Sequence, residues 1–193
     1  AAGFCAELCR RAGICSELED LGLHNKSGLQ DYPVVMVSAY QAQTFCRWLG
    51  YRLPTEVEWE RIARGLDGHS DWPWGTKSPP TPELLNVAYL DDFNQTPVLK
   101  RKAEPTRSLP AGAVAGLGIH HLAGNVWEWT ASAYIETDYA HNVDVWDLRS
   151  PKASPSRLTV RGGGYRTTLD SIDERSDYPP SSRDVDLGFR CAR

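Results

Sequence analysis

An excess of positive charge and long apolar runs are both missing from this chain. Its 193 residues include 21 Lys or Arg and 25 Asp or Glu, which gives a formal net charge of −4. No apolar run approaches the length of a membrane span. We therefore expect neither nucleic acid nor an anionic membrane as a partner, because both attract basic surfaces.

Recognisable catalytic motifs are also missing. The sequence contains no nucleophile motif, no phosphate-binding P-loop and no HExxH zinc motif. The adjacent His120 and His121 would point in opposite directions in an extended segment, so they are poorly placed to hold one metal together. These absences favour a protein without catalytic activity.

Cysteine is scarce, and methionine occurs once. The five cysteines are an odd number, so at least one is unpaired within the chain. The sequence starts at Ala1 without methionine or a signal peptide, and Phe4, Leu8 and Ala12 share one face of a helix. We therefore expect a single domain over residues 1–193 that begins inside a helix and is N-terminally incomplete. The compartment and the oligomeric state are left open, with a cytoplasmic location as the expectation.

Two helices are predicted, because each has a capping box followed by apolar residues at helical spacing. Ser38 with Gln41 forms the first box, and Thr55 with Glu58 forms the second. Residues 66–117 are rich in Pro, Gly and Asp and keep no sustained period. This composition predicts long ordered loops between the second helix and the strands that follow.

The most informative stretch is residues 118–130, where Glu128 stands between Trp127 and Trp129. In an extended segment the two tryptophans share one side, and Glu128 faces the other. A buried carboxylate without a partner is costly. Glu128 is therefore expected either to bind backbone amides or an arginine, or to help hold a cation. Residues 158–160 predict a further short strand that leads into three glycines.

Six segments of the chain resemble, in the same order, the signature motifs of the formylglycine-generating enzyme (sulfatase-modifying factor) superfamily. Residues 52–60 match that family's R-L-P-T-E-A-E-W-E almost letter for letter. The others are residues 33–42, continued by 45–50, and residues 72–75, 118–130, 161–165 and 187–192. The resemblance implies an α+β, C-type-lectin-like fold with two main helices, short strands and much irregular loop.

The same resemblance shows what is lacking at the reactive centre. Formylglycine-generating enzymes carry a Cys-x4-Cys pair just after the segment that residues 161–165 resemble, and two thiolates at this spacing can bind copper(I). Thr167 and Ile172 stand at those positions here. Neither side chain can ligate copper. We therefore expect no bound copper and no conversion of a cysteine peptide to formylglycine.

A disulfide is also implied by the resemblance. Some family members join the positions matched by Cys46 and Cys191, so a bridge is feasible in this chain. A reducing compartment would instead leave two neighbouring buried thiols.

Family members often bind calcium at two sites. The first is matched by the side chains of Asn86 and Asp91 and by the carbonyls of Val87 and Phe93. Oxygen ligands of this kind suit a hard cation such as Ca²⁺. The alternative is a turn held by Asx hydrogen bonds.

The second calcium site would use His121, Glu128 and the carbonyls of Gly124 and Val126. The family has Asp or Asn where His121 stands, and imidazole is a poor calcium ligand. We expect no calcium at this second site. We expect Glu128 to remain as a buried hydrogen-bond acceptor.

Residues 166–186 are polar, charged and without periodicity, and they lie between two family-like segments. The flanking segments are expected in the core and this one as an exposed loop. In the family the loop forms the floor of the substrate groove. In the variable proteins of diversity-generating retroelements, which resemble the same family, it is the diversified binding surface. Residues of the types found in such surfaces are Arg166, Thr167, Thr168, Asp170, Ser171, Asp173, Tyr178, Ser181, Ser182, Arg183, Asp184 and Asp186. The alternative is a solvated loop with Asp–Arg pairs.

Three functions remain open at this stage. The first is a non-catalytic domain that binds a protein or peptide ligand through residues 166–186, either as a retroelement variable protein or as a sensor module. The second is an oxidoreductase of the same superfamily with chemistry other than copper-thiolate formylglycine formation. The third is a structural relative that modulates a partner.

Overall fold

The structure is a computed structural model that describes residues 31–65, 68–76, 79–90, 97–98, 102–114, 116–136 and 155–193. The chain divides into two compact units, Ala1–Tyr32 and Pro33–Arg193. The helical face predicted for Phe4, Leu8 and Ala12 lies outside the described residues, so the following account concerns the second unit. The single domain over residues 1–193 stays a prediction. In the described part of the chain, no helix has the length and apolar character that crossing a membrane requires.

Both predicted helices are present with their capping boxes. Helix α3 spans Ala39–Trp48 and helix α4 spans Glu56–Ala63. The Gln41 backbone N–H donates to the Ser38 hydroxyl, and the Gln41 side chain in turn accepts from the Ser38 backbone N–H. Thr55 and Glu58 make the same reciprocal pair at α4. These bonds satisfy backbone donors that the first turn of a helix leaves free.

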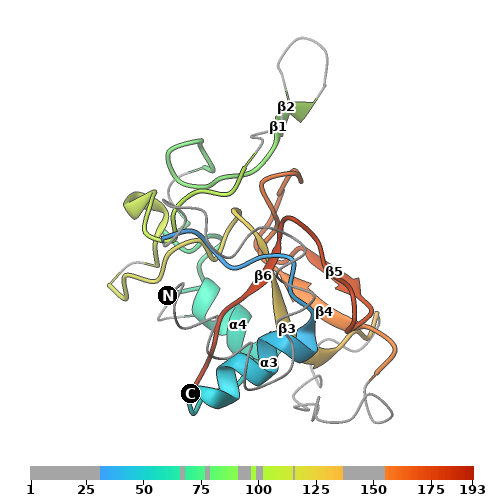
Figure 1. Ribbon diagram of the computed structural model, residues 1–193. Coiled ribbons are helices and arrows are strands. Elements are labelled where there is room, and N and C mark those ends of the chain that lie inside the picture. Colours follow the sequence, from blue (N-terminus) through green and yellow to red (C-terminus); the bar gives the residue numbers. More distant parts are fainter. Residues whose placement is uncertain are drawn as a thin grey trace. The chain divides into compact units, whose positions relative to one another are not determined.

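A four-stranded mixed sheet forms the centre of this unit (Figure 1). Its strands are β3 (Trp127–Ala133), β4 (Leu158–Arg161), β5 (Arg175–Tyr178) and β6 (Leu187–Phe189), in the order β5-β4-β3-β6. Strand β6 runs parallel to β3, whereas the other neighbours are antiparallel. A separate antiparallel pair joins β1 (Tyr89–Leu90) to β2 (Pro97–Val98), and a 3-10 turn, η1, spans Pro110–Gly112. The α+β fold class predicted from the sequence is confirmed.

The described residues form two hydrophobic clusters, and strand β3 contributes Trp127, Trp129 and Ala131 to the first of them. The first cluster packs α3 on the sheet through Ala39, Ala42, Cys46, Leu53, Trp127, Trp129, Ala131, Leu158, Val160 and Leu187. The second surrounds α4 and contains Trp59, Ala63, Trp72, Leu85, Val87, Val114, Leu122, Ala123, Leu169 and Ile172. Glu128 points away from the two tryptophans of β3 and contacts Trp59 of the second cluster. Both sides of β3 are therefore buried.

A buried ion network joins α4 to the sheet. The Arg161 side chain is fully buried, and its Nη2 lies 2.6 Å from Glu60 Oε2 while its Nη1 lies 3.6 Å from Glu56 Oε1. Arg175 donates to both oxygens of Glu56, at 2.5 and 3.0 Å. The Arg161 guanidinium also lies 5.2 Å from the centre of the Trp59 ring. Charge pairing and cation–π attraction therefore compensate the burial of this guanidinium.

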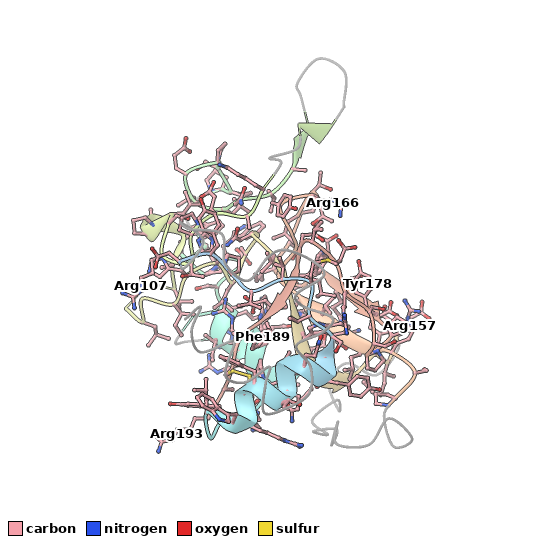
Figure 2. All side chains as sticks on the ribbon, viewed as in Figure 1. Arg107, Arg157, Arg166, Tyr178, Phe189 and Arg193 are labelled. Carbon is pink, nitrogen blue, oxygen red and sulfur yellow. A yellow bond between two sulfur atoms is a disulfide. The ribbon has the colours of Figure 1, made fainter. Side chains whose placement is uncertain are left out.

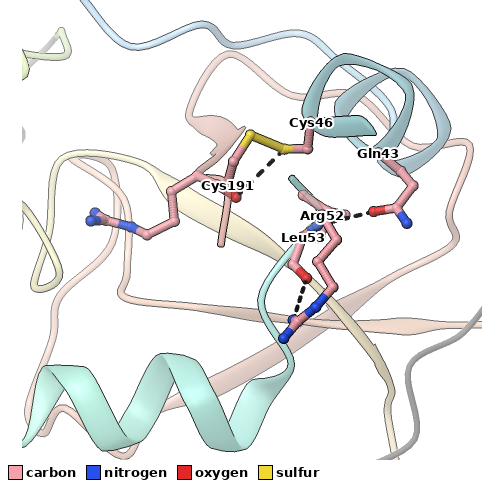
Figure 3. Close-up of a disulfide and its surroundings, with 6 residues drawn as sticks. Gln43, Cys46, Arg52, Leu53 and Cys191 are labelled. Carbon is pink, nitrogen blue, oxygen red and sulfur yellow. Dashed lines mark hydrogen bonds between the residues drawn. A yellow bond between two sulfur atoms is a disulfide. The ribbon is translucent and has the colours of Figure 1, made fainter. Parts of the chain in front are cut away.

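A disulfide between Cys46 and Cys191 ties the last turn of α3 to the C-terminal segment (Figure 3). The two Cα atoms are 5.5 Å apart, within the range of ordinary disulfides. Beside it, the Leu53 backbone N–H donates to the Gln43 side chain at 3.0 Å. The proximity that we predicted for these two cysteines is confirmed.

The prediction of an exposed loop over residues 166–186 is wrong in part. Strand β5 lies inside this segment and pairs along its length with β4. Leu169, Ile172 and Pro180 are buried. The four residues of β5 are polar or half-buried and sit at the edge of the sheet, so they lack the apolar alternation by which a strand is recognised.

Candidate functional site

Glu128 is held by two donors from distant parts of the chain. Its Oε2 accepts from Trp59 Nε1 at 2.7 Å, and both of its oxygens accept from the Arg190 guanidinium. Arg190 Nη2 also donates to the carbonyls of His120 and His121. The prediction of a buried hydrogen-bond acceptor is confirmed, and the arginine expected as a possible partner of Glu128 is Arg190.

His121 is directed at a neighbouring loop rather than at Glu128. Its backbone has φ of 54°, and its Nε2 lies 3.0 Å from the Pro105 carbonyl oxygen and 3.1 Å from the Ser108 hydroxyl. Burial lowers the pKa of His121, so the imidazole is favoured in its neutral form. Within the described ranges, no group of three or more His, Cys, Asp or Glu side chains is arranged to hold a metal ion.

Asn86 presents one oxygen without a protein partner. Its side chain is fully buried, and its Nδ2 donates to Asn125 Oδ1 at 3.1 Å and to the Lys102 carbonyl at 3.2 Å. Its Oδ1 is buried and accepts no hydrogen bond. Two further ligands of the predicted calcium site, the Asp91 side chain and the Phe93 carbonyl, lie outside the described residues. A buried amide oxygen of this kind fits a hard cation.

Thr167 and Ile172, at the positions of the family's copper-binding cysteines, are engaged in other contacts. The Thr167 hydroxyl donates to the Gly164 carbonyl and accepts from the Gly164 backbone N–H, both at 3.0 Å. Ile172 has an exposed fraction of 1% and packs in the second hydrophobic cluster beside Leu169. A polar turn and an apolar contact therefore occupy the place where the resemblance puts a thiolate pair.

The residues predicted to bind a ligand differ widely in exposure. The exposed ones are Arg166, Asp170, Asp173 and Ser181. The half-buried ones are Thr167, Thr168, Ser171, Tyr178, Ser182, Arg183 and Asp184. Asp186 is buried, contrary to the prediction that it is part of an exposed loop. In Figure 2 both Arg166 and Tyr178 lie toward the upper right of this unit, and Tyr178 is the last residue of β5.

Tyr178, predicted to bind a ligand, also contributes to the hydrophobic core. Its ring meets Trp129 edge-on, with the ring centres 6.3 Å apart, and it packs against the first hydrophobic cluster. Truncating Tyr178 would therefore remove core contacts as well as any contact to a ligand.

Arg166, Asp184 and Asp186 form a charged cluster just before the start of β6. Arg166 Nη1 lies 3.0 Å from Asp184 Oδ1 and 4.0 Å from Asp186 Oδ1. Burial, and then the negative charge of Asp184, raise the pKa of Asp186 to about 6. Tyr165 lies near Asp184 and Asp186. It was not among the predicted ligand-binding residues, because it belongs to a segment that was expected to be core. Burial and the charge of Asp186 raise the pKa of the Tyr165 phenol.

The protein should lose stability as the pH rises through the titration of Asp186. The unfolded carboxyl has its ordinary value near 3.8, whereas the folded one titrates at about 6. Between these values the folded state holds more protons, so the free energy of unfolding falls with rising pH. Asp186→Asn should flatten this slope in urea denaturation across the window, and Asp71→Asn, an exposed control, should preserve it. An equally steep slope in Asp186→Asn would contradict the assignment.

Together, the capped helices, the mixed sheet and the long irregular segments define a C-type-lectin-like α+β domain of the formylglycine-generating type. Residues 8–193 match the family described as the Sulfatase-modifying factor enzyme 1-like domain, and the chain belongs to this family.

Relatives in this family include enzymes and inactive forms. The chain is 34% identical over 172 residues to the formylglycine-generating enzyme of Streptomyces coelicolor, covering 86% of the chain and 54% of that protein. It is 33% identical over 169 residues to the inactive C-alpha-formylglycine-generating enzyme 2 of Bos taurus, covering 84% of the chain and 50% of that protein. The chain thus spans about half the length of the curated relatives it matches.

Two solved structures share the fold at low sequence identity. PvdO from Pseudomonas aeruginosa superposes with a TM-score of 0.63 at 20% identity, covering 86% of this chain and 63% of that one. Variable protein 1 of Treponema denticola gives a TM-score of 0.52 at 20% identity, covering 86% of this chain and 74% of that one. At this level of identity the likeness shows the fold alone.

Proposed function

We propose that this domain is a non-catalytic binding module that holds a protein or peptide ligand at residues 166–186, as a variable protein or a sensor module does. The observation that carries the proposal is the position of Ile172. Where the family's reactive centre has a cysteine, this side chain is 1% exposed and forms part of the core. The scaffold is kept, but the group that performs the copper chemistry is replaced by packing.

The way in which the segment is fixed also supports a binding role. Arg161 donates to the carbonyls of Ile172, Asp173 and Glu174, and Arg64 pairs with the Asp173 side chain. These bonds hold the backbone while the exposed side chains stay in solvent. A preorganised loop loses less conformational entropy on binding than a flexible one. The similarity to an inactive relative agrees with this role.

Combined substitution of exposed positions in the segment should weaken binding without unfolding the domain. We expect Arg166→Ala, Asp170→Ala and Ser181→Ala together to raise the Kd of a ligand selected from a displayed random-peptide library at least about tenfold, equivalent to about 1.4 kcal/mol. Each change should cost at most about 0.5 kcal/mol of stability, because these side chains are exposed.

Thr44→Ala on the exposed face of α3 is the matched control and should leave the Kd unchanged. Calorimetric titration gives the Kd, and urea denaturation gives the stability. Undiminished affinity in the triple variant would show that the ligand binds elsewhere, for example near Trp72 and Trp74. A large loss of stability with affinity intact would show that the segment serves the scaffold.

An oxidoreductase is the second candidate, favoured by one comparison. The chain is 37% identical over 105 residues to the hercynine oxygenase of Mycobacterium tuberculosis, covering 53% of the chain and 22% of that protein. Incubating the protein with copper, oxygen and a cysteine peptide of the sulfatase type, followed by mass spectrometry, tests for formylglycine chemistry. We expect an unchanged peptide from either candidate, and copper-dependent formylglycine would refute the first proposal. Oxygen consumption that depends on an added small-molecule substrate would favour the oxidoreductase.

We also propose a calcium ion at Asn86 and Val87, completed by Asp91 and Phe93. The buried Asn86 Oδ1, which accepts no hydrogen bond, supports this site. When bound, the ion would tie the segment after Asn86 to the chain and stabilise the fold by mass action.

Calcium bound at the site that includes Asn86 should raise the melting temperature of the protein. At a calcium concentration of about 100 times the Kd, the stabilisation is about 2.7 kcal/mol. Asp91→Ala should abolish the rise in a thermal denaturation series with calcium or with EDTA. Glu128→Gln is the control and should keep the rise, because Glu128 is occupied by Arg190. A rise that survives Asp91→Ala and disappears in Glu128→Gln would place the ion at the second site instead.

A further inference from the structure

Residues 86–88, which we call the Asn86 segment, join two parts of the candidate site by backbone hydrogen bonds. All three residues are buried. The Asn86 carbonyl accepts from the Asn125 backbone N–H at 2.7 Å, and the Ala88 backbone N–H donates to the Thr167 carbonyl at 2.9 Å. The Asn86 segment therefore contacts both Asn125 and the beginning of the proposed ligand-binding segment.

The backbone on both sides of Arg166 depends on these contacts. The Tyr165 backbone N–H donates to the Asn125 carbonyl at 2.9 Å, and the Thr167 carbonyl accepts from Ala88. Arg166 itself is exposed and is among the residues predicted to bind a ligand. A rearrangement of the Asn86 segment would therefore change how Arg166 is presented to a ligand.

Asn86 carries a buried oxygen that favours such a rearrangement unless a cation binds it. The Asn86 side chain is fully buried, and its amide nitrogen donates to Asn125 Oδ1 and to the Lys102 carbonyl. Its Oδ1 accepts no hydrogen bond. A buried polar atom without a partner is unfavourable, and the protein can remove this cost by moving the Asn86 segment or by binding a hard cation at Oδ1. A bound cation therefore favours the arrangement described above over its alternatives.

We propose that calcium at the Asn86 side chain orders the ligand-binding segment, so that calcium and the protein or peptide ligand bind cooperatively. This inference rests on the proposed binding function and the proposed calcium site, and it adds the route by which one acts on the other. The route consists of the backbone hydrogen bonds from Ala88 to Thr167 and from Tyr165 to Asn125. A segment that is ordered beforehand loses less conformational entropy on binding. The coupling is reciprocal, so the ligand tightens calcium binding by the same factor.

Amide hydrogen exchange with calcium as the only probe tests the route directly. Relative to EDTA, calcium should slow exchange of the Ala88 and Tyr165 amides at least about fivefold more than exchange of the Leu53 amide. The Leu53 amide is the internal control for stabilisation of the whole fold. It donates to Gln43, and Leu53 belongs to the first hydrophobic cluster, whereas Val87 belongs to the second. Equal slowing of all three amides would overturn the route.

Asn86→Leu removes the buried oxygen and should abolish the extra protection of the Ala88 and Tyr165 amides. Should Asn86→Leu fail to fold, Asp91→Ala gives the same test. Asp71→Asn changes an exposed carboxylate and should retain the full calcium effect. Extra protection by calcium that persists in a folded Asn86→Leu or Asp91→Ala variant would show that the ion does not act through Asn86.

Peptide binding provides a second measurement and separates this inference from the functions on which it rests. The Kd of a library-selected peptide should be at least about fivefold lower in calcium than in EDTA. Equal Kd values would overturn the coupling and leave the binding function standing. If no library peptide maps to residues 166–186, the binding function fails, and the amide comparison still decides whether calcium orders the segment. A protein whose melting temperature and amides ignore calcium would refute the calcium site and the coupling together.

Discussion

Replacing Arg161 with alanine is expected to lower the free energy of unfolding by about 3–5 kcal/mol. The guanidinium is fully buried between Glu56 and Glu60 of α4, and it also donates to backbone carbonyls of residues 172–174. Its removal leaves carboxylates with less compensation and carbonyls without their donor. The loss should therefore loosen α4 and the predicted binding segment together.

Urea denaturation of matched variants measures this effect. Arg157→Ala is the control, because its ion pair with Asp177 is half-exposed and should contribute less than about 1 kcal/mol. Arg161→Lys keeps the charge but cannot reproduce the bonds of a planar guanidinium, so it should fall between wild type and Arg161→Ala. A loss in Arg161→Ala no larger than that in Arg157→Ala would show that the buried network does not stabilise the fold.

The features predicted from the sequence are those encoded by neighbouring residues. A capping box needs only residues three apart, so Ser38 with Gln41 and Thr55 with Glu58 located both helices. The alternation around Glu128 likewise placed the tryptophans on one side of β3 and the carboxylate on the other. The family resemblance supplied the fold and the pairing of the two cysteines.

The structural features that were not predicted from the sequence depend on contacts between distant residues. Strand β5 consists of polar residues and is recognisable only from its pairing with β4. Arg161 and its partner Glu60 are 101 positions apart, so no local pattern indicates that this arginine is buried. The choice between an arginine and a cation for Glu128 was open for the same reason, because Arg190 lies 62 positions further on.

In the candidate site, too, local features were predicted from the sequence and long-range contacts were not. Residue types in 166–186 indicated a polar surface, and several of these side chains are exposed. The burial of Asp186 follows from its contact with Gly164, which only the folded backbone brings about. Tyr165 joins the site for the same reason. A sequence can thus indicate which segment faces solvent, but it does not show which of its carboxylates is desolvated.

Loss of the Cys46–Cys191 disulfide is expected to cost about 2–5 kcal/mol of stability. The bridge spans 145 positions of sequence, and a link across a long loop removes much of the conformational entropy of the unfolded chain. It also anchors the segment that carries Arg190 to α3, next to the partly buried Arg190–Glu128 pair. The effect should therefore reach the environment of Trp59, which donates to Glu128.

The test compares Cys46→Ser/Cys191→Ser with the wild-type pair in a background where Cys5, Cys9 and Cys15 are all replaced by serine. Without reductant, the double variant should unfold at a lower urea concentration. Adding dithiothreitol should lower the midpoint of the protein that keeps the pair to about that of the double variant, and should leave the double variant unchanged. Reduction and substitution break the same bond, so both should lower the urea midpoint. An unchanged midpoint after both would mean that packing of α3 against β3 alone holds the C-terminal segment in place.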